Sequence, residues 1–141
     1  MVVLGADTKK IRTLDTVKVL NYIYNNFTKI DIENIIYENF DNFKNFLPNN
    51  IYVEKSIDKP IMKLETPKQT IFPIKKDELN SISSEVYHLQ KIKSPTSLNQ
   101  KIGEITIKLN NEILVSSNIL LDNILHRKTW KWYYKELLQF F

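Results

Sequence analysis

The spacing of apolar positions changes twice along the chain, and each spacing predicts a different kind of element. Residues 13–27 carry apolar side chains three or four positions apart, which is typical of a helix with one buried face. Thr13 is its expected N-cap, and Asp15 lies in the first turn, where the helix dipole favours an acidic side chain. Before this helix, the apolar run 2–4 predicts a short buried strand that ends at Gly5.

From residue 28 to residue 118 apolar and polar positions alternate, which predicts short β-strands. The alternating segments are 30–32, 51–53, 61–64, 70–74, 86–89, 105–109 and 113–115. Asn110 and Asn111 separate the last two segments and tolerate the positive φ angles that a two-residue hairpin requires. Residues 75–79 predict a single helical turn. Because prolines punctuate these strands, the pattern predicts a mainly β fold, an antiparallel β-sandwich.

The segment 122–141 contains neither proline nor glycine and predicts a C-terminal amphipathic helix. At about 100° per residue, the side chains within about 80° of Trp130 are Tyr133, Tyr134, Leu137, Leu138, Phe140 and Phe141. The opposite side gathers Lys128, Lys131, Lys135 and Gln139, and only Trp132 lies on the wrong face. Such a helix either packs its aromatic stripe on the domain or lies in a membrane interface, with its lysines near anionic lipid.

Composition narrows the class of protein. The chain has 141 residues, 43% of them hydrophobic and 26% charged, as expected of one ordinary globular domain rather than a disordered tail. The sequence has no run of 18 apolar residues, so it predicts no membrane-spanning helix, and its first residues do not resemble a signal peptide. The absence of cysteine excludes a disulfide scaffold, a thiolate zinc site and a cysteine nucleophile. The net charge of +4 comes mainly from lysine, which reads base edges poorly, so it argues only weakly for nucleic acid.

The sequence contains little that could form a cofactor or metal site. Its two glycines, Gly5 and Gly103, cannot build a glycine-rich nucleotide loop. The two histidines, His88 and His126, lie 38 positions apart and lack metal-ligand spacing. We expect His88 to be an ordinary strand residue and His126 to add charge before the basic helix at low pH. The sequence predicts no cofactor and no metal.

Matches to the S-x-x-K, S-x-N and K-T-G motifs of serine acyltransferases are expected by chance in so lysine- and asparagine-rich a chain. The S-x-x-K at 56–59 is followed by Pro60 in a strand-like region, although the chemistry needs serine and lysine on one helical turn. S-x-N occurs at 97–99 and 116–118, and the only K-T pair is followed by Trp130 instead of glycine. The sequence therefore predicts no catalytic residue.

Two stretches carry a family resemblance. VVLGADTKKIR at 2–12, followed by Asp15, Leu20 and Phe27, and then Ser94-Pro95 with QKIGEITI at 100–107, resemble the serine-type D-alanyl-D-alanine carboxypeptidases, the low-molecular-weight penicillin-binding proteins. The first stretch resembles the last strand and helix of their catalytic domain, and the second their C-terminal β-sandwich. Ile23 departs from the family, which commonly has glycine at that position.

The resemblance implies a C-terminal fragment with three parts. Residues 1–28 would be the terminal strand and helix of a truncated catalytic domain, 29–118 the β-sandwich, and 119–141 a membrane-associating helix. The family's catalytic motifs would lie upstream, so we expect this chain alone to be inactive. The expected membrane-binding residues are Trp130, Tyr133, Tyr134, Leu137, Leu138, Phe141, Lys128, Lys131 and Lys135.

The resemblance also implies the setting of the intact parent. It would remove the terminal D-Ala of peptidoglycan stem peptides at the outer face of the cytoplasmic membrane, with the membrane surface as a partner of its C-terminal helix. As given, without a signal peptide, the chain is expected to be cytoplasmic.

One alternative is a stand-alone β-rich module that binds an anionic lipid or polymer. Single-stranded nucleic acid is not an expected partner, because the aromatic residues cluster on the terminal helix rather than along strands.

Overall fold

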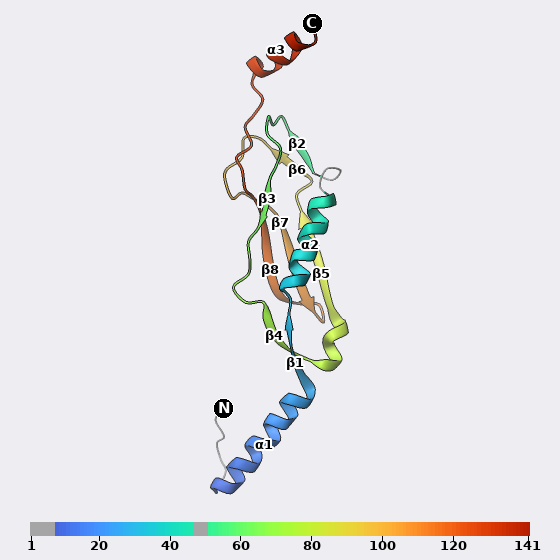
Figure 1. Cartoon of the computed structure of the whole chain (residues 1–141), viewed down its shortest axis with the longest axis vertical. Coiled ribbons are helices and arrows are strands. Elements are labelled where there is room, and N and C mark those ends of the chain that lie inside the picture. The colour runs from blue at the N-terminus through green and yellow to red at the C-terminus, as the bar shows by residue number, and fades with distance from the viewer. Residues whose placement is uncertain (1–7, 47–50) are drawn as a thin grey trace.

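The computed structural model describes residues 8–46 and 51–141 and has an elongated body with one helix projecting from each end (Figure 1). Helix α1 (Lys9–Asn26) leaves one end, and helix α3 (Trp130–Gln139) leaves the other. The strand expected at 2–4 lies outside the described residues. The two projecting helices are therefore separated by the whole length of the body.

A four-stranded antiparallel sheet forms the centre of the body. Its strand order is β3 (Met62–Leu64), β8 (Glu112–Leu121), β7 (Lys101–Leu109) and β5 (Ile82–His88). The predicted hairpin joins β7 to β8, and Asn110 and Asn111 adopt φ angles of 50° and 68°. The predicted helical turn is the 3₁₀ helix η2 (Lys76–Ser81). The expectation of a mainly β fold with antiparallel sheets and a C-terminal helix is confirmed.

Two short ladders complete the strands. β1 (Phe27–Asp31) pairs with β4 (Ile71–Lys75) in antiparallel fashion. β2 (Tyr52–Glu54) and β6 (Lys91–Lys93) pair in parallel, at the end of the body from which α3 departs (Figure 1). This parallel pair is an exception to the predicted antiparallel pattern. A parallel pair is possible here because β2 and β6 are not joined by a hairpin, which would make them antiparallel.

Helix α2 (Glu33–Phe46) was not predicted. Its buried residues, Ile36, Phe40 and Phe43, recur at helical spacing and pack in one core with β7 and β8. In Figure 1, α2 lies across the four-stranded sheet. A helix therefore supplies part of the layer that a second sheet would supply in a sandwich. The fully buried members of this core include Ile32, Ile92, Ile102, Ile105, Ile107, Ile119, Leu121 and Leu125.

Helix α1 begins earlier than expected and lacks the expected buried face. Its N-cap is Thr8, whose hydroxyl accepts from the Ile11 N–H at 3.3 Å. The prediction of Thr13 as the N-cap was wrong, because the Thr13 hydroxyl donates to the Lys9 carbonyl one turn back, inside the helix. All residues of α1 are at least partly exposed, because the body contacts the helix only near its C-terminal end.

Helix α3 is shorter than the predicted 122–141. Residues 122–128 instead form an extended strap, because their backbone groups are bonded to distant parts of the body. The Asp122 N–H donates to Ile61 O at 2.7 Å, and the Lys128 N–H donates to Lys55 O at 2.7 Å. Between them, the Leu125 N–H donates to the Thr96 hydroxyl at 2.9 Å. These bonds use backbone N–H groups of residues 122–128 outside a helix, so the helix begins only at Trp130.

Candidate membrane-interaction site

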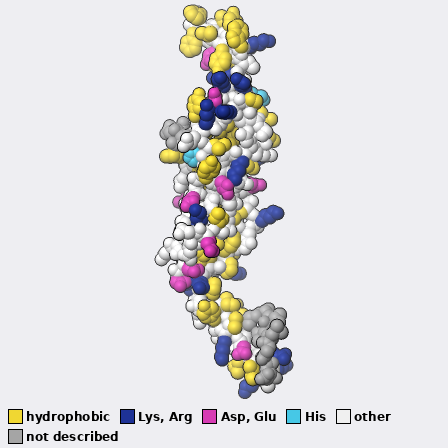
Figure 2. All heavy atoms as spheres, turned by 180° about the vertical axis from the view of Figure 1, so that it is seen from behind, with side chains coloured by type: hydrophobic (Ala, Val, Ile, Leu, Met, Phe, Trp, Pro, Cys, Tyr) yellow, Lys and Arg dark blue, Asp and Glu magenta, His cyan; other side chains and the backbone are white. Residues whose placement is uncertain are grey.

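Helix α3 presents an apolar surface that the body does not cover. Trp130 is 78% exposed and Phe140 is 83% exposed, and none of the ten residues of α3 is buried. Exposed contiguous apolar surface of this kind marks an interaction site in a folded protein. The end-on position of the helix leaves this surface accessible (Figure 2).

The aromatic side chains of α3 are ordered by contacts with one another. The rings of Trp130 and Tyr134, one helical turn apart, are stacked with their centroids 5.6 Å apart and their planes at 11°. Trp132 and Tyr133 meet edge to face at 5.5 Å. Aromatic pairs in these geometries are favourable beyond the area that they bury. The apolar surface is therefore partly organised before any partner binds.

Trp132, which the helical pattern put on the wrong face, has a partner of its own. The Lys128 Nζ lies 3.8 Å from the centroid of the Trp132 ring and 5.9 Å from that of Tyr133. A cation over an indole face is a favourable contact. Trp132 is half-buried as a result, whereas Trp130 projects from the helix. The two tryptophans thus have different environments.

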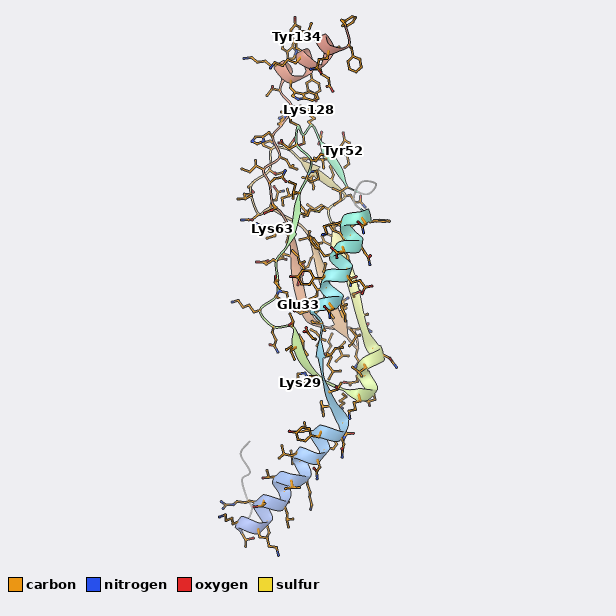
Figure 3. All side chains as sticks on the ribbon, in the orientation of Figure 1. Lys29, Glu33, Tyr52, Lys63, Lys128 and Tyr134 are labelled. Carbon is orange, nitrogen blue, oxygen red and sulfur yellow. The ribbon has the colours of Figure 1, made fainter. Side chains whose placement is uncertain are left out.

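The structure brings the predicted membrane-binding residues onto one short element. The exposed apolar ones are Trp130, Tyr133, Tyr134, Leu137, Leu138 and Phe141. Of the predicted lysines, Lys131 and Lys135 are exposed, and Lys128 lies at the base of the helix over Trp132. Phe140 was on the predicted apolar face but not among the predicted binding residues, and it is as exposed as the rest. Figure 3 shows Lys128 and Tyr134 together at this end of the molecule.

The strap below α3 is attached to the body by His126 and Asp58. The backbone N–H of His126 donates to Asp58 Oδ2 at 2.8 Å, and the His126 Nδ1 lies 2.7 Å from the same oxygen. These bonds, the backbone one first, hold the pKa of Asp58 below its ordinary value. Sequence reasoning missed this pair because its members lie far apart in the chain, with no local pattern to connect them.

The motif-like serines have structural surroundings of their own. Ser56 lies at an isolated bridge to Arg127, and its hydroxyl donates to Asp58 O at 2.8 Å. The hydroxyl of Ser116, the serine of the S-x-N match at 116–118, donates to the Glu104 carboxylate of the neighbouring strand. His88 ends β5, as expected of a strand residue, and the centroid of its ring lies 5.5 Å from that of Phe43. Ser56 thus lies at a β-bridge followed by a bend, and not on a helix with Lys59.

Among residues 8–46 and 51–141, no helix is both long and apolar enough to cross a membrane. The same ranges contain no group of three or more His, Asp or Glu side chains placed to hold a metal ion.

Comparisons with known proteins identify the domain. Residues 40–127, more than half of the chain, match the family "Penicillin-binding protein 5, C-terminal domain". No curated protein sequence matches the chain. Among solved structures, the D-alanyl-D-alanine carboxypeptidase DacD from Francisella tularensis is similar, with 14% identity, a TM-score of 0.49, and coverage of 89% of this chain and 29% of DacD.

Penicillin-binding protein 5 from Haemophilus influenzae is also similar, with 17% identity and a TM-score of 0.48 over 89% of this chain and 34% of that protein. This chain therefore spans about a third of the length of the solved structures that it matches. The family match covers most of the body described above, from within α2 to the strap. The chain belongs to the family of the penicillin-binding protein 5 C-terminal domain.

Proposed function

We propose that this chain is the membrane-proximal part of a D-Ala-D-Ala carboxypeptidase-like protein, in which the body is a spacer and α3 is an interfacial anchor. The observation that carries the proposal is the uncovered aromatic and leucine face of α3, at the opposite end of the body from α1 (Figure 1). An elongated body with unlike helices at its two ends suits a spacer between a catalytic domain and a surface.

The residues of α3 favour binding in the plane of the interface. Each aromatic or leucine side chain transferred out of water contributes about 1.5–3 kcal/mol. Each lysine near an anionic surface adds about 1 kcal/mol. With ten residues, α3 is about 15 Å long, whereas the hydrocarbon core is about 30 Å thick. An in-plane helix is therefore the membrane mode that these residues support.

The activity of the whole protein is part of the same proposal. A preceding catalytic domain would carry the nucleophilic serine and remove the terminal D-Ala of peptidoglycan stem peptides at the outer face of the cytoplasmic membrane. The exposed apolar side chains of α1, such as Leu14 at 52%, are consistent with a helix that packs on such a domain. The chain alone, which carries no catalytic serine motif in a helix, is expected to form no covalent adduct with penicillin.

The two tryptophans provide a test of the anchor. Trp132→Phe leaves Trp130 as the only tryptophan, and Trp130→Phe leaves Trp132. With vesicles of phosphatidylglycerol and phosphatidylethanolamine, we expect the emission of Trp130 to shift to the blue and its quenching by acrylamide to fall. Trp132, already covered by Lys128, should change less and is the matched control. Equal emission with and without vesicles in both variants, and no co-sedimentation of the unaltered chain, would refute the anchor.

A further inference from the structure

A pocket lies at the end of the body just below α3. It has a volume of about 210 Å³, and its walls are formed by Glu54, Lys55, Lys93, Ser94 and Arg127. We call it the basic pocket. In Figure 2, lysine and arginine side chains gather at the junction between the body and the terminal helix. The pocket is therefore part of the membrane-proximal end and not of the sides of the body.

Backbone pairing brings the three cationic residues together from three segments. Glu54 in β2 is the register partner of Lys93 in β6. The Ser94 N–H and hydroxyl both donate to Glu54 O, at 3.4 Å and 2.6 Å. The Lys55 carbonyl accepts from the Lys128 N–H, next to Arg127. The pocket thus has a hydrogen-bonded backbone frame, and only its cationic side chains are long and adaptable.

The positive charge of the pocket is not neutralised within the protein. Glu54 is the single carboxylate in its walls, against three cations. Glu54 is bonded to Lys91 at 2.9 Å, and this bond, with the nearby Lys55 and Lys93, lowers the pKa of Glu54. Within residues 8–46 and 51–141, none of the three cations of the pocket, Lys55, Lys93 and Arg127, forms an ion pair. The pocket is therefore suited to an anionic ligand.

The backbone of Lys55, at the wall of the basic pocket, has a conformation that lysine does not favour. Its φ angle is 52°, in the left-handed region that glycine and asparagine occupy more easily than lysine. A lysine held in this conformation costs conformational energy that asparagine would avoid. Strained residues of this kind cluster at ligand sites, where the surrounding structure maintains them.

We propose that the basic pocket binds the phosphate of an anionic phospholipid headgroup. The Arg127 guanidinium can donate two parallel hydrogen bonds to phosphate oxygens, and Lys55 and Lys93 supply point charges. The ligand is a lipid rather than a soluble phosphate because Arg127 lies three residues before Trp130, whose ring projects from the proposed anchor. The α3 N-cap, Thr129, makes no side-chain capping bond, so the positive end of the helix dipole adds to the same field. The inference rests on the proposed interfacial anchor and gives it a headgroup preference.

The test compares phosphatidylglycerol vesicles with phosphatidylcholine vesicles. The variants are Lys55→Asn, Lys93→Gln and Arg127→Gln, singly and combined, and the matched control is Lys29→Gln. Lys29 is an exposed strand lysine at the far end of the body from Lys128 (Figure 3). Asn at position 55 removes the charge while easing the backbone, so we expect this variant to unfold at no lower temperature than the unaltered chain.

Each single pocket variant should bind phosphatidylglycerol vesicles about fivefold more weakly, and the triple variant about a hundredfold. Binding to phosphatidylcholine, whose choline cation balances the charge of its phosphate, should stay within about twofold. Lys29→Gln should change binding to phosphatidylglycerol by less than about twofold, since charges beyond a Debye length of about 10 Å are screened. If the triple variant loses no more than Lys29→Gln does, the pocket is not a lipid site, although the anchor stands. If the unaltered chain binds neither vesicle, the anchor itself fails. Saturable binding of inorganic phosphate without vesicles would assign the pocket to a soluble ligand and overturn the lipid assignment.

Discussion

The two end helices are both exposed, yet their apolar residues are arranged in opposite ways. In α1, Leu14, Val19 and Leu20 project in directions about 100–140° apart around the helix axis, so apolar side chains surround the helix. In α3, the aromatic and leucine residues other than Trp132 share one side, and Lys131 and Lys135 lie on the other. A helix that is apolar all round is suited to burial within a larger protein, whereas a segregated helix is suited to a boundary.

This difference separates two meanings of exposed apolar surface. The exposure of α1 is consistent with a missing protein neighbour, because no single orientation would place all of its apolar residues at a membrane surface. The exposure of α3 is consistent with a planar partner, because one orientation places its apolar side in lipid and its lysines near the headgroups. Equal changes in the two helices should therefore have unequal effects on vesicle binding.

The largest expected difference follows from removing two apolar side chains from each helix. Leu137→Ala with Leu138→Ala should weaken binding to phosphatidylglycerol vesicles at least about a hundredfold, because two leucines transferred from water contribute about 3–6 kcal/mol together. Leu14→Ala with Val17→Ala in α1 is the matched pair and should change binding less than about twofold. Co-sedimentation over a range of lipid concentrations measures both. A loss of binding from the α1 pair as large as that from the α3 pair would break the comparison.

The body between the helices is expected to unfold independently of α3. A Cβ at Gly103 would lie 2.7 Å from Tyr87 O of the neighbouring strand, a backbone atom that cannot move aside easily. Gly103→Ala should therefore lower the free energy of unfolding by about 3 kcal/mol, measured by denaturant titration. Ser83→Ala, at an exposed position of β5, should change it by less than about 0.5 kcal/mol.

The same variant also tests whether vesicle binding by α3 depends on the packing of the body. Below its unfolding transition, Gly103→Ala should bind vesicles like the unaltered chain, since α3 lies outside the core. Weaker binding by the folded variant would mean that α3 depends on packing within the body.

The lysines of the two helices should differ by a smaller factor. Lys131→Gln with Lys135→Gln removes two charges from the polar side of α3 and should weaken binding to phosphatidylglycerol about 25-fold, from about 1 kcal/mol per charge. Lys10→Gln with Lys18→Gln removes the same charge from α1 and should have little effect. The difference should shrink in 1 M salt, where the Debye length is about 3 Å. A difference that persists unchanged at that salt concentration would argue against an electrostatic origin.

How much of this molecule could be predicted depended on whether a feature is local in sequence. The alternation at 105–109 and the Asn110-Asn111 turn were enough to predict the hairpin. The spacing of the apolar residues in 130–141 was enough to predict the apolar side of α3. Helix α2 was missed because asparagine recurs along it and the alternation at 30–32 was extended past its true end at Asp31. Its signal was the spacing of Ile36, Phe40 and Phe43.

Non-local features carried no comparable signal. The parallel pairing of β2 with β6 joins segments about 40 residues apart, and the basic pocket adds Arg127 from a third segment. None of these cations stands out in a lysine-rich chain. The buried face expected of α1 was wrong because its apolar side chains surround the helix, and because periodicity does not report whether a neighbour covers them.

The smallest expected effect concerns how the two helices join the body. The strap to α3 depends on the Asp58 carboxylate, whereas α1 continues into β1 through the Phe27 N–H, which donates to the Ile23 carbonyl. Because the pKa of Asp58 is lowered in the folded chain, the stabilisation that its carboxylate gives the folded state is present above the ordinary value of 3.8. This stabilisation is lost as the pH falls through the lower folded-state pKa.

Asp58→Asn should therefore reduce amide-exchange protection of the Lys128 N–H near neutral pH, relative to the unaltered chain. The two proteins should converge as the pH falls through the folded-state pKa of Asp58. Protection of the Arg12 N–H, which donates to Thr8 O inside α1, should be the same in both proteins at every pH. A Lys128 difference that persisted at low pH would show that the shape of the side chain, and not its charge, fastens α3 to the body.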